Sequence, residues 1–274
     1  MKIHLLAEAS PNPVLTAVMA ELAGRHEVAV FDAQTLPAGY GPGSELLEPP
    51  DVVLLKSRTP QARRVAETAE RAGSLVVNSP AATAAALDRA VTAAALDRAG
   101  VPTPRSWCVP ALRSLATDGA ALPWPLVVKS RTSSRRDLVR LVSSPAELRE
   151  LLPEWGDEPV VAQEFAANDG FDIKFWVIGA DLSAARRRSA LESVDKSSDT
   201  FLEPADLPEE WTRTARNAGR AMGLQLYGAD LLITGGRPVV VDVNPFPGFR
   251  GAHGPAESLL RFLSTVAIPR TVTA

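Results

Sequence analysis

Three oxygen-bearing side chains near the carboxyl end of the chain have the spacing of a metal site. Asp242 and Asn244 lie two residues apart in an apolar run that is typical of a buried strand, so their side chains point to the same face. Asp230 lies in the preceding apolar run. We expect residues 235–237, Gly-Gly-Arg, to form a three-residue hairpin loop that pairs Asp230 with Asp242.

Two carboxylates that face each other across a hairpin repel. A hard cation held by oxygen ligands relieves this repulsion. Asp230, Asp242 and the amide oxygen of Asn244 leave coordination positions for water and phosphate oxygens, as Mg²⁺ prefers when it binds a nucleotide. The alternative is a solvent-facing hairpin with hydrated acids, which the valine-rich run around Asp242 disfavours.

Basic residues lie within or at the ends of two further predicted strands. Lys129 ends the apolar strand expected over 124–130, where its ammonium group either extends to solvent or binds phosphate. Asp172 and Lys174 share one face of the strand expected over 172–179. They form either a surface ion pair or contacts to a ribose and a phosphate.

Lys56 and Arg58 follow an amino-terminal strand expected over 51–56. Ligands bind at the carboxyl ends of strands in open α/β sheets, so these residues are substrate candidates, with a loop salt bridge as the equal alternative.

Two arginine clusters are also candidates. Residues 186–188, Arg-Arg-Arg, are expected to form a basic turn in which at least one guanidinium can clamp a transferring phosphoryl group, although a solvated side chain is favoured for Arg186. Arg131, Arg135 and Arg136 lie in the loop after Lys129 and either cover phosphates or are solvated.

The amino-terminal hundred residues alternate strand and helix patterns. Strands are expected over 2–7, 27–33, 51–56 and 74–78, helices over 13–25 and 60–72, and a loop over 39–50. Repeated βα units predict an α/β domain with a parallel sheet. No Gly-x-Gly-x-x-Gly motif follows the first strand, which disfavours a dinucleotide-binding domain.

An alanine-rich repeat over 83–99 predicts a helix that ends at Gly100, before Pro102 and Pro104. We place a domain boundary there. The prediction is an amino-terminal α/β domain over 1–104 and an α+β domain over 105–274, with further strands expected over 160–165 and 227–234 and helices over 144–152, 209–222 and 257–266.

Composition excludes several classes of protein. The net charge of −3 argues against broad nucleic-acid binding, and the single cysteine, Cys108, excludes a disulfide framework. Three scattered histidines do not form a zinc motif. No apolar run approaches the ~18 residues of a membrane span, and the first residues do not resemble a signal peptide, so we expect a cytoplasmic protein without membrane or nucleic-acid partners.

Taken in order, these motifs resemble the ATP-grasp superfamily over residues 76–255. The motifs are Asn78-Ser-Pro, Asp88-Arg89, Gly100-Val-Pro-Thr-Pro, Pro125-Leu-Val-Val-Lys129, Gln163-Glu-Phe165, Asp172-Ile-Lys174, Arg188, Asp230 and Asp242-Val-Asn244-Pro-Phe-Pro-Gly248. The resemblance implies that ATP lies between two α+β subdomains, about 105–162 and 163–274.

The resemblance also implies roles for individual residues. Lys129 would contact the nucleotide phosphates, Asp172 would hold the ribose, and Lys174 would reach phosphate or substrate. The backbone of Gln163, Glu164 and Phe165 would contact the adenine, through the C=O of Glu164 and the N–H of Phe165. Asp230, Asp242 and Asn244 would bind one or two Mg²⁺, for which Mn²⁺ can substitute, and Arg188 would stabilise the transferring phosphoryl group.

Two branches of the superfamily fit these motifs. RimK-like carboxylate–amine ligases form an acyl phosphate from a small amino-acid-like or peptide acid, and inositol phosphate kinases phosphorylate a polyol phosphate. The ligase is our first hypothesis, the kinase the alternative and a non-catalytic nucleotide-binding module the third. Lys56, Arg58, Gly248 and Arg250 are the expected contacts to a small anionic substrate. The sequence does not distinguish a monomer from a homodimer.

Overall fold

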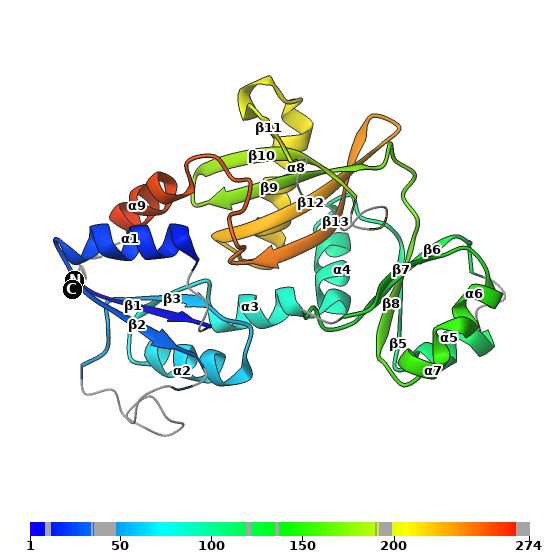
Figure 1. The fold of residues 1–274 in the computed structure, drawn as a ribbon, viewed down its shortest axis with the longest axis horizontal. Helices are drawn as coiled ribbons and strands as arrows, with labels where there is room; N and C mark the ends of the chain where they lie inside the picture. Colours follow the sequence, from blue (N-terminus) through cyan, green and yellow to red (C-terminus); the bar gives the residue numbers. More distant parts are fainter. Residues whose placement is uncertain are drawn as a thin grey trace.

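A computed structural model of the chain describes residues 1–8, 12–33, 35, 48–118, 122–134, 137–189, 191 and 199–266. Most of the loop expected over 39–50, together with Arg135 and Arg136, lies outside the described residues. Three sheets follow one another across the molecule (Figure 1). None of the helices in the described part is long and apolar enough to span a membrane.

The amino-terminal sheet is parallel, with strand order β2-β1-β3-β4, which confirms the predicted α/β class. Its elements are β1 (Lys2–Ala7), α1 (Pro13–Ala23), β2 (Glu27–Asp32), β3 (Val52–Lys56), α2 (Pro60–Arg71) and β4 (Leu75–Val77). Both helices begin with a proline after a polar N-cap residue, Asn12 or Thr59. Helix α1 packs against one face of this sheet and α2 against the other.

The alanine-rich repeat forms two helices, so the prediction of one helix up to Gly100 is wrong. Helix α3 (Pro80–Leu87) ends at Asp88, and α4 (Arg89–Arg98) begins there. The Asp88 carboxylate accepts hydrogen bonds from the N–H groups of Ala90 and Val91 and binds the Arg131 guanidinium through both oxygens. An aspartate that caps a new helix interrupts the old one, despite the helix propensity of the surrounding alanines.

The second sheet is antiparallel, has five strands in the order β11-β10-β9-β12-β13, and carries most of the candidate residues. Its elements are β9 (Phe171–Ile178), β10 (Asp181–Arg188), β11 (Thr200–Leu202), the 3-10 turn η2 (Pro204–Asp206), α8 (Glu209–Met222), β12 (Leu226–Thr234) and β13 (Arg237–Pro245). Helices α3, α4 and α8 contribute to the apolar core beneath it. The boundary at residue 104 remains a prediction, since α3 and α4 precede it in the chain but pack on this sheet.

The hairpin β12–β13 has the predicted pairing but a different loop. Thr234 pairs with Arg237, so the loop is Gly235-Gly236 alone, with φ of 57° and 82°. Both values lie in the left-handed region that a two-residue hairpin turn requires and that glycine adopts without strain. A bulge then places the extra residue Val241 on β13, and Asp230 lies opposite Asp242 as expected.

The third sheet is antiparallel with strand order β5-β8-β6-β7. Its elements are β5 (Ser106–Val109), α5 (Leu112–Asp118), β6 (Leu126–Ser130), β7 (Val139–Val142), α6 (Pro145–Glu150), α7 (Leu152–Trp155) and β8 (Val160–Glu164). The three helices cover one face of this sheet, at the far end of the molecule from β1 (Figure 1). The Ser144 hydroxyl caps α6, as the sequence predicts.

Asn78 joins the first sheet to the second. This side chain is 2% exposed. Its Oδ1 accepts from the N–H groups of Gln225 and Leu226 at 2.9 and 3.0 Å, and its Nδ2 donates to the Leu226 carbonyl at 2.7 Å. One amide therefore satisfies three backbone groups at the start of β12. The closing helix α9 (Pro255–Val266) adds an apolar contact by packing on α1.

We expect Asn78→Ala to lower the free energy of unfolding by about 3 kcal/mol, because the N–H groups of Gln225 and Leu226 lose their acceptor. The Leu226 carbonyl keeps the hydrogen bond from the Phe246 N–H. Asn78→Asp should destabilise the chain at least as much, because a carboxylate cannot donate to the Leu226 carbonyl. Urea unfolding measures both, with the exposed neighbour Gln225→Ala as the control. A loss no larger than that of the control would show that this junction does not stabilise the fold.

Candidate active site

A cavity of about 190 Å³ lies between the second and third sheets. Val127 and Val139 of the third sheet and Leu232 of the second make part of its lining apolar. Its charged lining residues are Arg89, Lys129, Glu164, Asp172, Arg187, Asp230 and Asp242. An apolar slot that continues into a charged region suits a nucleotide, with the base among the valines and the phosphates among the charges.

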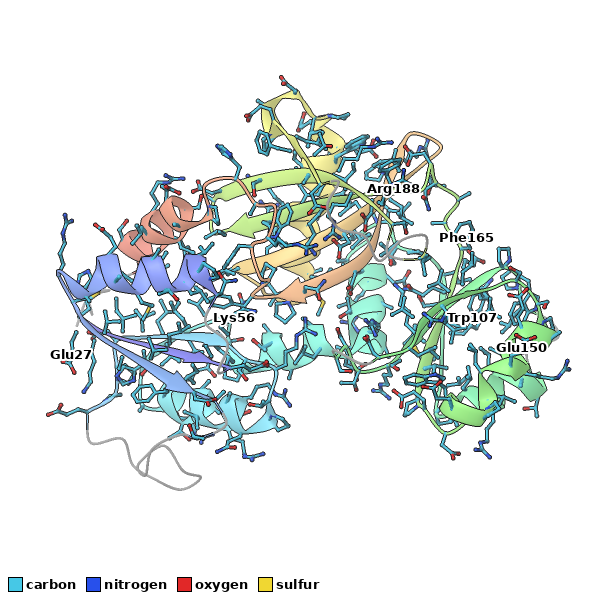
Figure 2. All side chains as sticks on the ribbon, in the orientation of Figure 1. Glu27, Lys56, Trp107, Glu150, Phe165 and Arg188 are labelled. Atoms are coloured by element: carbon cyan, nitrogen blue, oxygen red, sulfur yellow. The ribbon has the colours of Figure 1, made fainter. Side chains whose placement is uncertain are left out.

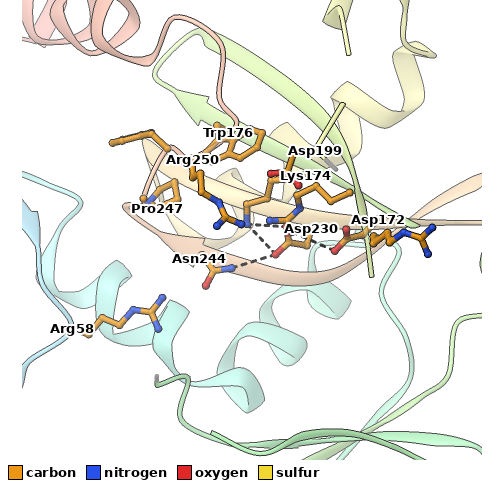
Figure 3. A pocket seen from close by; sticks show the side chains of 13 residues that line it. Arg58, Asp172, Lys174, Trp176, Asp199, Asp230, Asn244, Pro247 and Arg250 are labelled. Carbon is orange, nitrogen blue, oxygen red and sulfur yellow. Dashed lines mark hydrogen bonds and ion pairs between the residues drawn. The ribbon is translucent and has the colours of Figure 1, made fainter. Parts of the chain in front are cut away.

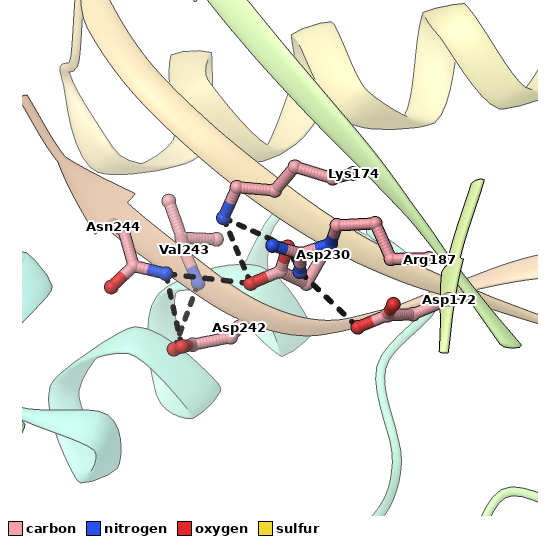
Figure 4. Close-up of polar contacts among 7 residues, drawn as sticks. All are labelled: Asp172, Lys174, Arg187, Asp230, Asp242, Val243 and Asn244. Carbon is pink, nitrogen blue, oxygen red and sulfur yellow. Dashed lines mark hydrogen bonds and ion pairs between the residues drawn. The ribbon is translucent and has the colours of Figure 1, made fainter. Parts of the chain in front are cut away.

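The predicted metal residues converge in this region (Figure 4). The Asn244 Nδ2 lies 3.0 Å from an oxygen of Asp242 and 3.5 Å from an oxygen of Asp230, so a positively polarised group stands between the two carboxylates. A rotation of the amide would present its oxygen instead. Within the described residues, no three acidic, histidine or cysteine side chains form a metal cluster. The protein donors fit Mg²⁺, which keeps water and phosphate oxygens as its other ligands.

Asp230 is the most heavily paired of the three. The Lys174 Nζ lies 2.8 Å from Asp230 Oδ1 and 3.0 Å from Oδ2, and the Arg187 guanidinium lies 3.0 Å from Oδ1. Arg187 also contacts Asp172 at 3.3 Å. Two cations therefore neutralise a buried carboxylate that stands opposite another carboxylate, which offsets the repulsion expected from the sequence.

The sequence analysis did not single out Arg187 as a site residue, because residues 186–188 were expected to form a turn. The segment is strand β10, in which Arg187 pairs with Asp172, and side chains of paired residues share a face. Arg188 therefore starts from the opposite face and is exposed, with its guanidinium 5.6 Å from the Phe171 ring centroid. Its side chain still lines the neighbouring cavity described below, and its catalytic role remains a prediction.

Asp172 has a buried oxygen that lacks a donor. Its Oδ1 has no hydrogen-bond partner among the described residues, whereas Oδ2 accepts from Arg187. Burial, and then the nearby charge of Asp230, raise the pKa of Asp172 to about 6. A buried acceptor of this kind fits a ligand hydroxyl group, in agreement with the ribose contact that the resemblance implies.

Lys129 is buried, and its Nζ donates to the Val241 carbonyl at 2.9 Å. Val241 is the bulged residue of β13, so its carbonyl is free of the regular ladder. Burial lowers the pKa of Lys129 to about 8, although the charge of Asp242 acts in the opposite direction. Burial alone would raise the pKa of Asp242, but the positive charges of Lys129 and Arg89 outweigh it and the pKa is lowered.

The predicted adenine contacts lie at the end of β8. Residues 163–166 line the cavity, and the Gln163 Nε2 donates to the Ser106 hydroxyl at 3.2 Å. The Phe165 N–H donates to the Pro125 carbonyl at 3.2 Å. An adenine that accepts from Phe165 would have to displace this bond, so the contact through Phe165 remains a prediction.

A second cavity of about 350 Å³ adjoins the first, and Asp172, Arg187 and Asp230 line both. Its other lining residues are Arg58, Lys174, Trp176, Arg188, Asp199, Asn244, Pro247, Gly248, Phe249 and Arg250. Figure 3 shows Arg58 and Arg250 approaching it from different elements. Three of the predicted substrate residues, Arg58, Gly248 and Arg250, are thus brought together. We name this space the arginine cavity.

Lys56 is not part of the arginine cavity. Its Nζ donates to the Phe246 carbonyl at 2.7 Å and lies 5.8 Å from the centroid of that ring. Lys56 and Arg58 both line a further space of about 890 Å³ between the first sheet and the five-stranded sheet. Figure 2 shows Lys56 facing the five-stranded sheet from the end of β3 and Phe165 at the third sheet. The predicted substrate contact of Lys56 remains a prediction.

The chain has relatives among curated proteins. A probable alpha-L-glutamate ligase from Shewanella loihica is 36% identical over 96 residues, which are 34% of this chain and 32% of the relative. The aligned part thus spans about a third of the length of that protein.

Solved structures are similar over nearly the whole chain. A RimK domain ATP-grasp protein from Sphaerobacter thermophilus has a TM-score of 0.76 at 21% identity, over 96% of this chain and 99% of that one. The ATP-grasp ligase PsnB, complexed with precursor peptide PsnA2 and AMPPNP, has a TM-score of 0.70 at 20% identity, over 97% of each chain. Both likenesses show the fold.

The strongest assignment comes from the sequence family. Residues 86–255 match the RimK-like ATP-grasp domain, and this range spans more than half of the chain. It includes the residues at the end of β8, the arginines of β10 and the carboxylate pair of the β12–β13 hairpin. The chain therefore belongs to the RimK-like ATP-grasp family.

Proposed function

We propose that this chain is an ADP-forming carboxylate–amine ligase that acts on a small anionic acid. The observation that carries the proposal is the wall of three charged residues, Asp172, Arg187 and Asp230, shared by the partly apolar slot between the second and third sheets and the arginine cavity. A nucleotide held between 105–162 and 163–274, with its base in the slot, directs its terminal phosphate toward that wall. An acid in the arginine cavity then lies on the far side of the same phosphate.

The reaction proceeds in two balanced steps. A carboxylate oxygen of the acid attacks the γ-phosphorus of ATP, the bond from that phosphorus to the β-phosphate oxygen breaks, and ADP leaves. An amine nitrogen then attacks the acyl carbon, the carbon–oxygen bond to phosphate breaks, and the amine loses a proton as the amide forms. Bound Mg²⁺ would supply charge neutralisation at the phosphates, held by Asp230, Asp242 and Asn244.

The residues of the chain contribute orientation and charge. The Lys129 ammonium group binds the Val241 carbonyl and the Lys174 ammonium group binds Asp230, and in this proposal both neutralise phosphate oxygens. In this proposal Arg188 stabilises the transferring phosphoryl group. Asp172 offers an oxygen without a protein donor to a ribose hydroxyl.

Charges in the arginine cavity favour an anionic acid. Among the described residues, Arg58, Arg188 and Arg250 have no carboxylate partner, whereas Lys174 and Arg187 are paired with Asp230. One arginine facing the phosphoryl group leaves two for the substrate, which suits an acid that carries a second negative group. Asp199, also in the lining, is placed to attract an ammonium group.

The comparisons support a ligase over a kinase. The relative in Shewanella loihica is named a probable alpha-L-glutamate ligase, and PsnB is a ligase whose structure holds a peptide and a nucleotide analogue. Another PsnB structure holds Mg and ADP with a minimal precursor. These names concern those proteins. They agree with a ligase that takes an amino-acid-like or peptide acid.

The test is ADP release from MgATP with a panel of amino acids, dicarboxylic acids, acidic peptides and inositol phosphates, repeated with hydroxylamine. A ligase forms ADP with an acid and a hydroxamate with hydroxylamine, because hydroxylamine captures the acyl phosphate. A stable phosphorylated inositol product without hydroxamate would establish the kinase. The absence of ADP release under all conditions, with retained nucleotide binding, would favour a non-catalytic module.

We expect Asp242→Asn to reduce ADP release at least about 100-fold, because it removes a charge from the metal donors. Chelation of Mg²⁺ should abolish turnover of the wild-type enzyme, and Mn²⁺ should restore it. The matched control is Asp181→Asn, which removes an exposed ion pair to Arg261 elsewhere on the same sheet. Equal rates for Asp242→Asn and the wild type would refute the metal assignment.

Nucleotide affinity should depend on the charge of Lys129. Its pKa of about 8 is below the ordinary value of 10.5, so the ammonium form is depleted as pH rises through 8. Phosphate oxygens favour that form, and the Kd of Mg-AMPPNP should rise by up to about tenfold per pH unit above 8. Lys129→Arg, which stays charged, should flatten the profile. Calorimetric titration measures the profile, and a flat wild-type curve between pH 8 and 10 would contradict the phosphate contact.

We expect the loss of Arg188 to lower kcat and the loss of Arg187 to lower stability. Arg188→Met should lower kcat at least about 100-fold with little change in stability, since its guanidinium is exposed. Arg187→Met should lower the free energy of unfolding by about 3 kcal/mol, because it leaves the charges of Asp172 and Asp230 less compensated. Steady-state kinetics and urea unfolding of both variants separate the effects. A stable Arg187→Met enzyme with the larger loss of kcat would transfer the clamp role to Arg187.

A further inference from the structure

The loop over 246–251 has an unfavourable backbone. Phe246 and Phe249 both lie in the left-handed region, with φ of 44° and 59°. Bulky residues seldom adopt this conformation, and it persists only where the surroundings enforce it. Both rings are buried, with 2% and 3% exposure, in the apolar core that includes α1 and α9. The shape of the loop therefore depends on the elements that it packs against.

Two side chains of the amino-terminal α/β region bind this loop through its carbonyl groups. The Asn12 Nδ2 donates to the Gly248 carbonyl at 2.6 Å, and the Lys56 Nζ donates to the Phe246 carbonyl at 2.7 Å. Asn12 precedes α1 and Lys56 is the last residue of β3, so both donors lie at the carboxyl end of the parallel sheet, which faces the site. We call Asn12 and Lys56 the loop clamp.

The clamped segment is a wall of the arginine cavity. Pro247, Gly248, Phe249 and Arg250 all line that cavity, and Arg58, two residues beyond Lys56, lines it as well. The loop clamp thus holds the segment that carries Arg250 against the domain that carries Arg58. Asn244, by contrast, belongs to β13, where the register with β12 holds it.

We propose that Asn12 and Lys56 are positioning residues for the acid substrate. They fix the loop over 246–251 so that Arg250 and Arg58 form one binding site, although neither clamp residue contacts the reacting atoms. The kinetic part of this proposal rests on the proposed function, because it assigns the arginine cavity to the acid. The nucleotide site is held by strand pairing and should be independent of the loop clamp.

A substitution at Asn12 can remove the hydrogen bond to the loop and keep the cap of α1. Its Oδ1 accepts from the Val14 N–H at 2.9 Å and caps α1, while its Nδ2 makes the bond to Gly248. Asn12→Asp keeps the capping oxygen and loses the donor, since a carboxylate only accepts. Lys56→Met removes the second donor without touching α1. Glu21→Ala, an exposed change further along α1, is the matched control.

The first measurement is hydrogen–deuterium exchange on the free full-length chain. In Asn12→Asp and Lys56→Met, amides over 246–252 should exchange at least tenfold faster than in the wild type, and amides of α1 should not change. The second measurement is ADP release from MgATP with each acid of the panel that supports it. The KM for the acid should rise at least tenfold, and the KM for ATP should stay within twofold.

Unchanged exchange of the loop in both variants would overturn the clamp. Faster exchange with an unchanged KM for the acid would overturn the positioning role. If the amides of α1 also exchange faster in Asn12→Asp, the proposal is judged on Lys56→Met alone, by the exchange of the loop and by the KM for the acid. If no acid supports ADP release, the proposed function fails, whereas the exchange result still shows whether the clamp holds the loop.

Discussion

The pairing of Asp230 with Asp242 is the constraint on which the rest of the site depends. Two carboxylates opposite each other on a hairpin are unfavourable, and here Asp230 is buried and Asp242 is half-buried. Lys174 and Arg187 compensate Asp230 directly, and Lys129 acts on Asp242 through its charge. These cations come from three strands in two sheets, so the electrostatics of one hairpin join the second sheet to the third.

The bulge at Val241 is the feature that places Asp230 opposite Asp242. A two-residue loop alone would pair Asp230 with Val241, and the extra residue restores the pairing with Asp242. The same residue offers a carbonyl outside the ladder, which Lys129 uses. One inserted residue therefore sets the position of the carboxylates and satisfies a buried ammonium group that would otherwise lose its hydration.

Patterns within one element were predictable from the sequence, and contacts between distant elements were not. The parallel sheet, α8 and the face shared by Asp172 and Lys174 follow from local periodicity. Strand β10 was missed because three consecutive arginines are not typical of a strand. Arg187 is held by the carboxylates of Asp172 and Asp230, which lie 15 and 43 residues away in the chain. Lys56 has an ordinary strand-end position, and only the fold brings the Phe246 carbonyl, 190 residues away, to its ammonium group.

The proposed nucleotide site and the proposed acid site differ in whether local or long-range contacts hold their residues. The residues that we propose for nucleotide binding are held by the pairing of adjacent strands, so their positions tolerate change elsewhere in the chain. The proposed acid site includes a loop with two phenylalanines in the left-handed region, and side chains of the amino-terminal region bind this loop. We therefore expect substitutions in the amino-terminal region to alter which acid is accepted while the phosphoryl chemistry is retained, because Lys174, Asn244 and the charged wall between the two cavities belong to the five-stranded sheet and not to the loop.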